Sequence, residues 1–240
     1  MNADNATETT QAAKAGQIVK PEAGALSAPS AELVETDAGT ARINWHHAAR
    51  PRLVLALGHG AGGGVHARDL AGLAAALPSH GVSVALVEQP WRVAGKKVAP
   101  APATLDRGWR GAWPSLRRPG LPVVAAGRSA GARVACRLAT ELDAAAVLAL
   151  AFPLHPPGRP ERSRAAELLG TEVPTLVVQG SRDPFGTPEE FPEGAYTLTR
   201  IPDADHAFAV PKRSGRTEQD TVTLITEAVR DWLHPLLAEA

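Results

Sequence analysis

Short apolar runs alternate with helical segments along most of the chain, and this pattern constrains the fold more than any other feature of the sequence. Strands that are apolar on both faces are typical of a parallel sheet covered by helices on each side. We therefore predict a single α/β domain with a mostly parallel central sheet. The predicted strands are residues 53–57, 82–87, 121–126, 145–150, 175–179 and 195–201. The predicted helices are residues 67–77, 103–116, 129–142, 162–169 and 217–237.

The N-terminal part of the chain follows a different pattern. Residues 1–28 are polar and lack apolar periodicity, so we predict a flexible tail there and a folded domain over residues 29–240. Two strand candidates, residues 32–36 and 41–45, flank Asp37-Ala38-Gly39, which suits a hairpin turn. The hairpin is expected to extend one edge of the sheet.

Composition excludes several classes of partner. Basic and acidic side chains number 25 each among the 240 residues, so no bulk charge favours nucleic acid or an anionic membrane. Residues 1–20 lack the apolar segment of a signal peptide, and the apolar stretch 144–154 is too short to cross a bilayer. We expect a cytoplasmic protein. Cys136, the only cysteine, excludes an intrachain disulfide and is expected in the core.

The motif Gly127-Arg128-Ser129-Ala130-Gly131 fits G-x-S-x-G and lies between a predicted strand and a predicted helix. In that context the pattern is typical of a nucleophile elbow, a sharp turn that exposes a serine hydroxyl and needs small flanking residues. Ser129 is therefore the predicted nucleophile. The alternative is an ordinary helix N-terminus that Ser129 caps.

A serine nucleophile needs a base to take its proton and a carboxylate to orient that base. Asp183 follows the strand at 175–179, and His206 follows the next strand, in the order serine, acid, histidine that hydrolases of this architecture use. Asp203 and Asp205 are rival acids, but they lie too close in sequence to His206 to reach its far nitrogen. Taken singly, Asp183 also suits a turn and His206 a solvated surface.

The loop at residues 58–64 is rich in glycine and follows the first central strand. Tetrahedral intermediates of acyl transfer need backbone donors for their oxyanion, and we predict the amides of Ala61 and Ala130 in that role. His59, in the same loop, is expected to be a buried packing or hydrogen-bonding residue. Gly60 is predicted to border the substrate, together with Trp91 and Arg92 of a later loop.

The same loop offers a rival interpretation. Gly58, Gly60 and Gly63 fit G-x-G-x-x-G after a strand, and Glu88 at the end of the next strand would serve as a ribose ligand. A dinucleotide site leaves Ser129 without a role. Phosphate-loop and zinc-protease motifs do not occur in the sequence, and His46-His47 alone is weak evidence for a metal. We therefore expect neither a cofactor nor a metal ion. Arg128 and Arg133 are expected in structural ion pairs rather than in a carboxylate clamp.

Taken together, these segments resemble the α/β-hydrolase superfamily, and within it the small, nearly lidless dienelactone-hydrolase-like branch. The narrower resemblance is to bacterial predicted hydrolases related to the NSL chromatin-complex regulatory subunit 3 and to a testis-expressed protein. It spans about residues 50–235 and leaves only residues 151–174 for a lid. The motifs that carry it are Gly58-His59-Gly60-Ala61-Gly62-Gly63, Gly127-Arg128-Ser129-Ala130-Gly131, Phe152-Pro153-Leu154-His155-Pro156-Pro157-Gly158 and Gln179-Gly180-Ser181-Arg182-Asp183-Pro184-Phe185-Gly186.

The resemblance implies a catalytic triad of Ser129, Asp183 and His206, although dienelactone hydrolases proper use cysteine where this chain has Ser129. We expect an esterase-like serine hydrolase that cleaves a small ester, thioester or related acyl bond through an acyl-serine intermediate. Its partner would be a small-molecule acyl substrate. A binding or scaffold protein that keeps the fold without catalysis is the main alternative, and a dinucleotide-binding protein is the second. The sequence specifies neither the acyl group nor the oligomeric state.

Overall fold

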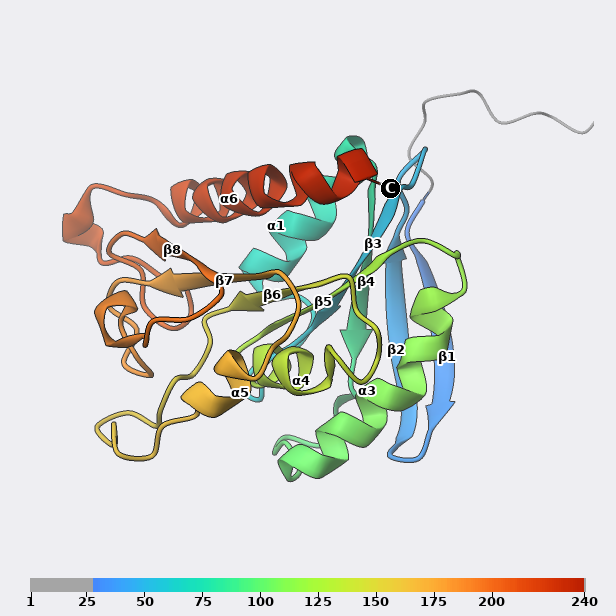
Figure 1. Cartoon of the computed structure of the whole chain (residues 1–240), viewed down its shortest axis with the longest axis horizontal. Coiled ribbons are helices and arrows are strands. Elements are labelled where there is room, and N and C mark those ends of the chain that lie inside the picture. Colours follow the sequence, from blue (N-terminus) through green and yellow to red (C-terminus); the bar gives the residue numbers. More distant parts are fainter. Residues whose placement is uncertain (1–27, 240) are drawn as a thin grey trace, which may run out of the picture.

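In the computed structural model, which describes residues 28–239, eight strands form one sheet with helices on both faces (Figure 1). The strand order is β1-β2-β4-β3-β5-β6-β7-β8. β2 pairs antiparallel with β1 and with β4, and all later pairs are parallel, which confirms the predicted mostly parallel sheet. The strands are β1 (Ser30–Thr36), β2 (Gly39–His46), β3 (Leu53–Gly58), β4 (Val82–Glu88), β5 (Val123–Arg128), β6 (Ala146–Leu150), β7 (Thr175–Gly180) and β8 (Thr197–Ile201).

The helices form one layer on each face of the sheet (Figure 1). Side chains of α1 and α6 pack into one half of the core, and those of α2, α3, α4 and α5 pack into the other. Their bounds are α1 (Arg68–Ala76), α2 (Pro90–Val93), α3 (Pro102–Arg117), α4 (Ala130–Leu138), α5 (Ala165–Leu169) and α6 (Glu218–Glu239). Single 3-10 turns cover Leu77–His80, Pro188–Glu190 and Lys212–Ser214.

The apolar strands are explained by burial on both sides. In β3, Val54 and Ala56 face the α3 and α4 layer, whereas Leu53, Leu55 and Leu57 face the α1 and α6 layer. All five are fully buried. A side chain on either face therefore removes apolar surface from water, which is why the strand pattern is a continuous apolar run.

The hairpin predicted near the N-terminus is present at the sheet edge. Thr36 of β1 pairs with Gly39 of β2, so the turn contains Asp37 and Ala38 as predicted. The predicted tail, residues 1–28, lies outside the described residues except for position 28.

Among the α-helices, two differ most from the sequence prediction, one in length and one in existence, and α5 begins three residues later than predicted, at Ala165. The helix predicted to end at residue 142 ends at Leu138, and the chain then turns through Asp143, whose φ of +54° cannot continue a helix. The short helix α2 was not predicted, because four residues give no periodicity. Its one signal is Pro90, since proline is favoured at the first position of a helix.

The fold leaves the site side of the sheet open. Residues 151–174, between β6 and β7, contain only the short α5, so the described chain has no lid domain. None of the helices within residues 28–239 combines the length and the apolar character needed to cross a bilayer. Cys136 lies in the core, as expected, and burial raises the pKa of its thiol to about 12.

Candidate active site

The turn after β5 holds Ser129 in a strained backbone conformation. Its φ is +54° and its ψ is −112°, a combination that residues with a side chain rarely adopt. Strand and helix pass so close here that a Cβ atom at Gly127 would lie 2.2 Å from the carbonyl carbon of Gly131. A Cβ atom at Gly131 would lie 2.7 Å from the oxygen of Gly58. The two flanking glycines are thus required by close backbone contact.

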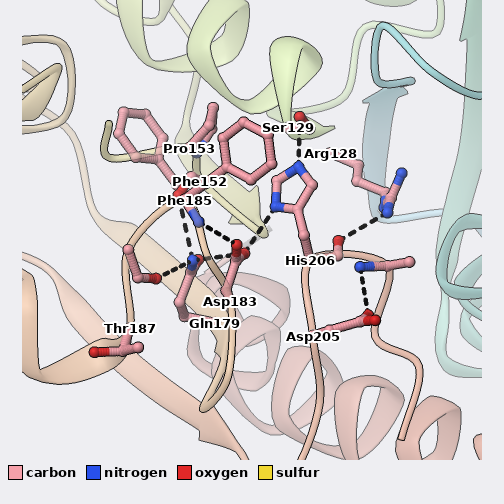
Figure 2. A network of polar contacts seen from close by, with 12 residues as sticks. Arg128, Ser129, Phe152, Pro153, Gln179, Asp183, Phe185, Thr187, Asp205 and His206 are labelled. Atoms are coloured by element: carbon pink, nitrogen blue, oxygen red, sulfur yellow. Dashed lines mark hydrogen bonds and ion pairs between the residues drawn. The ribbon is translucent and has the colours of Figure 1, made fainter. Parts of the chain in front are cut away.

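The Ser129 side chain faces the loop after β8 (Figure 2). Its Oγ lies 2.9 Å from Nε2 of His206, and Nδ1 of the same ring lies 2.8 Å from Oδ2 of Asp183. Among residues 28–239, Ser129 makes no side-chain cap to α4, so the capping alternative is wrong. The structure therefore brings the three predicted residues, from the loops after β5, β7 and β8, into one chain of contacts.

Asp183 is fully buried, and several donors fix its carboxylate. Oδ2 accepts a hydrogen bond from Nε2 of Gln179 at 2.9 Å, and Oδ1 accepts the backbone N–H of Phe185 at 2.8 Å. The Phe185 ring packs on the His206 imidazole with ring centroids 4.2 Å apart. With a carboxylate facing Nδ1, we assign the proton of the neutral imidazole to that nitrogen, which leaves Nε2 free to accept from serine.

Gln179 is a site residue to which the sequence analysis gave no role. It is fully buried, and its amide nitrogen also lies 3.3 Å from the carbonyl oxygen of Phe152 and 2.8 Å from that of Gly186, so its two N–H groups are shared among three acceptors. It thereby joins the segment after β6 to the Asp183 loop (Figure 2). A signal was present in the sequence, because Gln179 is a polar residue at the end of an otherwise apolar strand.

The aspartates beside His206 shape its loop. Oδ1 of Asp205 accepts two backbone N–H groups that follow His206, at 2.8 and 2.9 Å. Asp203 has a φ of +62°, and its carboxylate lies 3.4 Å from the Arg216 guanidinium. In the described structure neither carboxylate is bonded to the imidazole, in agreement with the expectation that they are poor rivals to Asp183.

The glycine loop after β3 passes directly beside Ser129. A Cβ atom at Gly60 would lie 3.3 Å from Cβ of Ser129. His59 anchors the loop, because its Nδ1 lies 2.8 Å from the oxygen of Gly60 and its Nε2 accepts the backbone N–H of Gln89 at 3.1 Å. Burial lowers the pKa of His59, which favours the neutral ring that this acceptor role requires. His59 is thus a buried hydrogen-bonding residue, as expected.

The residues predicted as oxyanion donors, Ala61 and Ala130, border one small pocket beside Ser129, which we call the inner pocket. Within residues 28–239 neither of their amides donates to a backbone carbonyl outside a helix. Both N–H groups therefore remain available to an oxygen bound next to Ser129. The residues that line the inner pocket are Gly58, His59, Gly60, Ala61, Gln89, Trp91, Ala99, Leu105, Trp109, Ala130, Gly131 and Val134.

Gly60, Trp91 and Arg92, which were predicted to border a substrate, do not all lie at the inner pocket. Gly60 and Trp91 line the inner pocket, and the Trp91 ring packs against His59 with centroids 5.6 Å apart. The Arg92 guanidinium lies over the Trp91 ring, 5.9 Å from its centroid, and next to Gly64. A substrate contact by Arg92 stays a prediction.

The geometry disfavours the dinucleotide interpretation. A Cβ atom at Gly63 would meet nothing within 4 Å, whereas the third glycine of that motif is needed for close helix packing. Glu88, the expected ribose ligand, pairs with Arg42 at 3.0 Å. The first turn of α1 also carries the buried carboxylate of Asp69, which opposes a pyrophosphate at that helix end.

The remaining candidate residues, Arg133 and His47, make contacts that hold the fold together. Arg133 donates to Glu167 at 2.7 Å, the ion pair that was expected. His47 stacks on Trp45 with ring centroids 5.4 Å apart. The described part of the chain holds no group of three or more histidine, cysteine or acidic side chains arranged for a metal ion.

Comparison with known proteins identifies the family. Residues 50–234 match the family described as "Alpha/beta hydrolase domain", which is more than half of the chain. The chain belongs to the alpha/beta hydrolase family. A comparison with curated proteins gives no match.

Solved structures share the alpha/beta hydrolase fold. XC6422 from Xanthomonas campestris, described as a serine hydrolase without lid, is 22% identical with a TM-score of 0.66, over 85% of this chain and 94% of that one. Dienelactone hydrolase from Anabaena variabilis is 20% identical with a TM-score of 0.67, over 86% and 97%. Est1E from Butyrivibrio proteoclasticus is 14% identical with a TM-score of 0.66, over 87% and 99%. At these identities the likeness shows the fold.

A buried ion pair in this alpha/beta hydrolase ties α1 to the loop that carries His206. Nε of Arg128 lies 3.2 Å from Oδ2 of Asp69. Nη2 of the same guanidinium donates to the carbonyl oxygen of His206 at 2.8 Å (Figure 2). The Asp69 side chain is 3% exposed and that of Arg128 is 13% exposed. Burial raises the pKa of Asp69, and the neighbouring guanidinium opposes the shift. Arg128 thus forms the structural ion pair that was expected, and it also holds the His206 backbone.

Removal of Asp69 alone is expected to cost more stability than removal of the whole ion pair. Asp69→Leu should lower the free energy of unfolding by about 3–5 kcal/mol, because it leaves the guanidinium buried without a counter-charge. The double variant with Arg128→Met should regain most of that loss in urea denaturation. Any hydrolase activity of the double variant should nevertheless stay below that of wild type, because the His206 carbonyl has lost its donor. A double variant no more stable than the single one would contradict this account.

A second polar contact joins the proline-rich segment after β6 to the turn that follows the Asp183 loop. Nδ1 of the buried His155 lies 2.9 Å from the oxygen of Pro156, and its Nε2 lies 2.9 Å from Oε2 of Glu190. An imidazole with both nitrogens facing acceptors is best satisfied when protonated. The Pro156 carbonyl raises the pKa of His155, and Glu190 adds to the shift, whereas burial and the Arg164 charge oppose it.

This contact predicts a stability that falls as the pH rises. The imidazole of the unfolded chain has a pKa of about 6.5. Because the folded pKa is higher, the stabilisation is complete below that value and is lost as the pH rises through the folded pKa. His155→Gln should therefore lower the free energy of unfolding more at about pH 6 than at about pH 9. Urea denaturation at both pH values checks this, with Glu190→Gln expected to follow the same trend. If His155→Gln lowered the free energy of unfolding equally at both pH values, a protonated His155 would not be the source of the stabilisation.

Proposed function

We propose that this alpha/beta hydrolase cleaves a small ester, thioester or related acyl bond through an acyl-Ser129 intermediate. The observation that carries the proposal is the chain of contacts from Ser129 Oγ through the His206 ring to the buried Asp183 carboxylate. Each side chain has the residue type and the hydrogen-bond distance that acyl transfer requires. The strained turn at Ser129 supports it, because such strain is typical of functional positions.

In the acylation step, Ser129 Oγ attacks the substrate carbonyl carbon while His206 Nε2 accepts the hydroxyl proton. Asp183 keeps the other ring proton on Nδ1 and stabilises the imidazolium that forms. The carbonyl oxygen becomes an oxyanion, which the Ala61 and Ala130 amides receive. His206 then returns the proton to the leaving group, whose bond to carbon breaks as the acyl-serine ester forms.

Deacylation repeats these roles with water. His206 Nε2 accepts a proton from a water molecule as its oxygen attacks the acyl carbon, and the same oxyanion donors act again. Collapse of the intermediate breaks the bond to Ser129 Oγ, which regains its proton from His206. The products are a carboxylic acid and the leaving-group alcohol or thiol, and the reaction needs neither cofactor nor metal.

The narrower assignments rest on the sequence. We place the enzyme in the dienelactone-hydrolase-like branch, to which the likeness with the Anabaena variabilis structure lends support. Its relation to the NSL regulatory subunit 3 group and its cytoplasmic location remain predictions from the sequence.

Acetyl transfer from p-nitrophenyl acetate tests the proposal. The protein should release p-nitrophenolate faster than buffer alone, and acid quenching followed by peptide mass spectrometry should find the acetyl group on Ser129. Release that stays at the buffer rate, or that Ser129→Ala leaves unchanged, would overturn the proposal. If the folded protein releases p-nitrophenolate no faster than buffer, the non-catalytic binding alternative is favoured.

A further inference from the structure

We propose that the inner pocket receives the acyl group of the substrate and restricts it to short apolar chains, from acetyl to butyryl. The inference rests on the proposed function and names the substrate class of the same site. Its first support is position, because the pocket borders both proposed oxyanion amides and lies beside Ser129.

The order of the strands decides which substrate group faces the pocket. Asp183 and His206 follow β7 and β8, which lie on one side of β5 and the Ser129 turn. The pocket is built from the loops after β3 and β4 and from α3 and α4, so it lies towards the other side. The leaving group must face His206, which gives it a proton. With the oxyanion at the Ala61 and Ala130 amides, the acyl chain is directed away from His206, into the pocket.

The wall of the pocket suits a hydrocarbon chain. Its apolar members include Leu105, Val134 and the two tryptophans, and each of these side chains is buried. The polar side chains among the lining residues are those of His59 and Gln89. The indole nitrogens of Trp91 and Trp109 are covered by other atoms and have no hydrogen-bond partner in residues 28–239. The surface that the rings present is therefore carbon, which offers nothing to a charged or strongly polar acyl group.

The size of the pocket limits the chain. It contains roughly 280 Å³ of empty space with its open mouth included, and this space is so narrow that a water-sized group fits in about one place. Trp109 packs tightly on β3, because a Cβ atom at Gly58 would lie 3.1 Å from Cζ3 of its ring. Gln89 adds a tie between walls by donating to the oxygen of Leu105 at 3.2 Å. A chain longer than a few carbons must therefore leave the pocket or distort it.

A series of p-nitrophenyl esters from acetate to octanoate tests the inference. Wild-type kcat/KM should be highest for a chain between acetate and butyrate and should fall at least about ten-fold by hexanoate. Val134→Ala and Leu105→Ala each widen the pocket, and each should move the optimum to a longer chain. Val98→Ala removes the same methyl groups from a side chain that is 80% exposed, and it should leave the profile unchanged.

The outcomes separate this inference from the proposed function. A wild-type optimum at hexanoate or longer would overturn it. A chain-length profile that stays unchanged in both Val134→Ala and Leu105→Ala would also overturn it, because the pocket would then be a packing void that holds no acyl chain. In those cases turnover that depends on Ser129 would leave the proposed function intact, whereas no Ser129-dependent turnover of any ester would overturn both. If Val134→Ala fails to fold, Leu105→Ala decides the test, because Leu105 lies on a different helix.

Discussion

Ser129→Ala and His206→Ala are each expected to lower kcat for ester hydrolysis by about 10⁵- to 10⁶-fold, and the double variant should be no worse than either. The reason is that nucleophile and base act as one unit: without His206 the Ser129 hydroxyl keeps its proton, and without Ser129 the imidazole has nothing to activate. Steady-state hydrolysis of p-nitrophenyl acetate measures the effect. Ser79→Ala, at an exposed position, is the matched control and should retain full activity.

The comparison of the double variant with the two single variants is the informative part of this result. If the losses multiplied in the double variant, Ser129 and His206 would act independently, and the contact between them would have no catalytic role. If either single variant kept more than a few per cent of wild-type kcat while folded, as judged by circular dichroism, the contact between Ser129 and His206 would not be part of the catalytic centre.

Gly127→Ala is expected to abolish activity and to destabilise the protein by about 1–3 kcal/mol or more. The added Cβ atom would lie 2.2 Å from the carbonyl carbon and 2.4 Å from the oxygen of Gly131. These are backbone atoms at the start of α4, so relief requires the helix to move away from β5, and Ser129 moves with it. Urea denaturation and ester hydrolysis measure the two effects.

Gly63→Ala provides the matched control for that change. Its Cβ atom would have no heavy atom within 4 Å, although Gly63 lies in the same glycine-rich loop that passes Ser129. Stability should stay within about 0.5 kcal/mol of wild type. A Gly127→Ala protein as stable and active as Gly63→Ala would show that the close approach of strand and helix is not needed.

The sheet could be predicted from the sequence because burial on both faces leaves a direct pattern. Strands such as β3 and β5 are continuous apolar runs, and every predicted strand is present within two residues of its expected bounds. Helix ends were harder to predict. α4 ends at Leu138 although the helical pattern continues to Leu142, and the chain leaves it through the left-handed backbone of Asp143, which aspartate adopts only in some contexts.

The positions of Ser129, Asp183 and His206 could be predicted because parallel strands bring the loops at their carboxyl ends together. The contacts that hold these residues in place could not be predicted in the same way. Gln179 and Arg128 act through hydrogen bonds to partners between 4 and 78 residues away, and no local pattern specifies such pairs. The inner pocket also escapes sequence analysis, because its volume depends on how Trp109 and Val134 pack across separate helices.

The most direct test of the account is to label the folded protein with a fluorophosphonate and to map the modified residue by peptide mass spectrometry. The account predicts one probe per chain, on the Ser129 oxygen, with labelling abolished in Ser129→Ala and strongly slowed in His206→Ala. Wild-type protein that is folded and yet resists the probe, or that carries it on a residue other than Ser129, would contradict the central claim that Ser129 is an activated nucleophile.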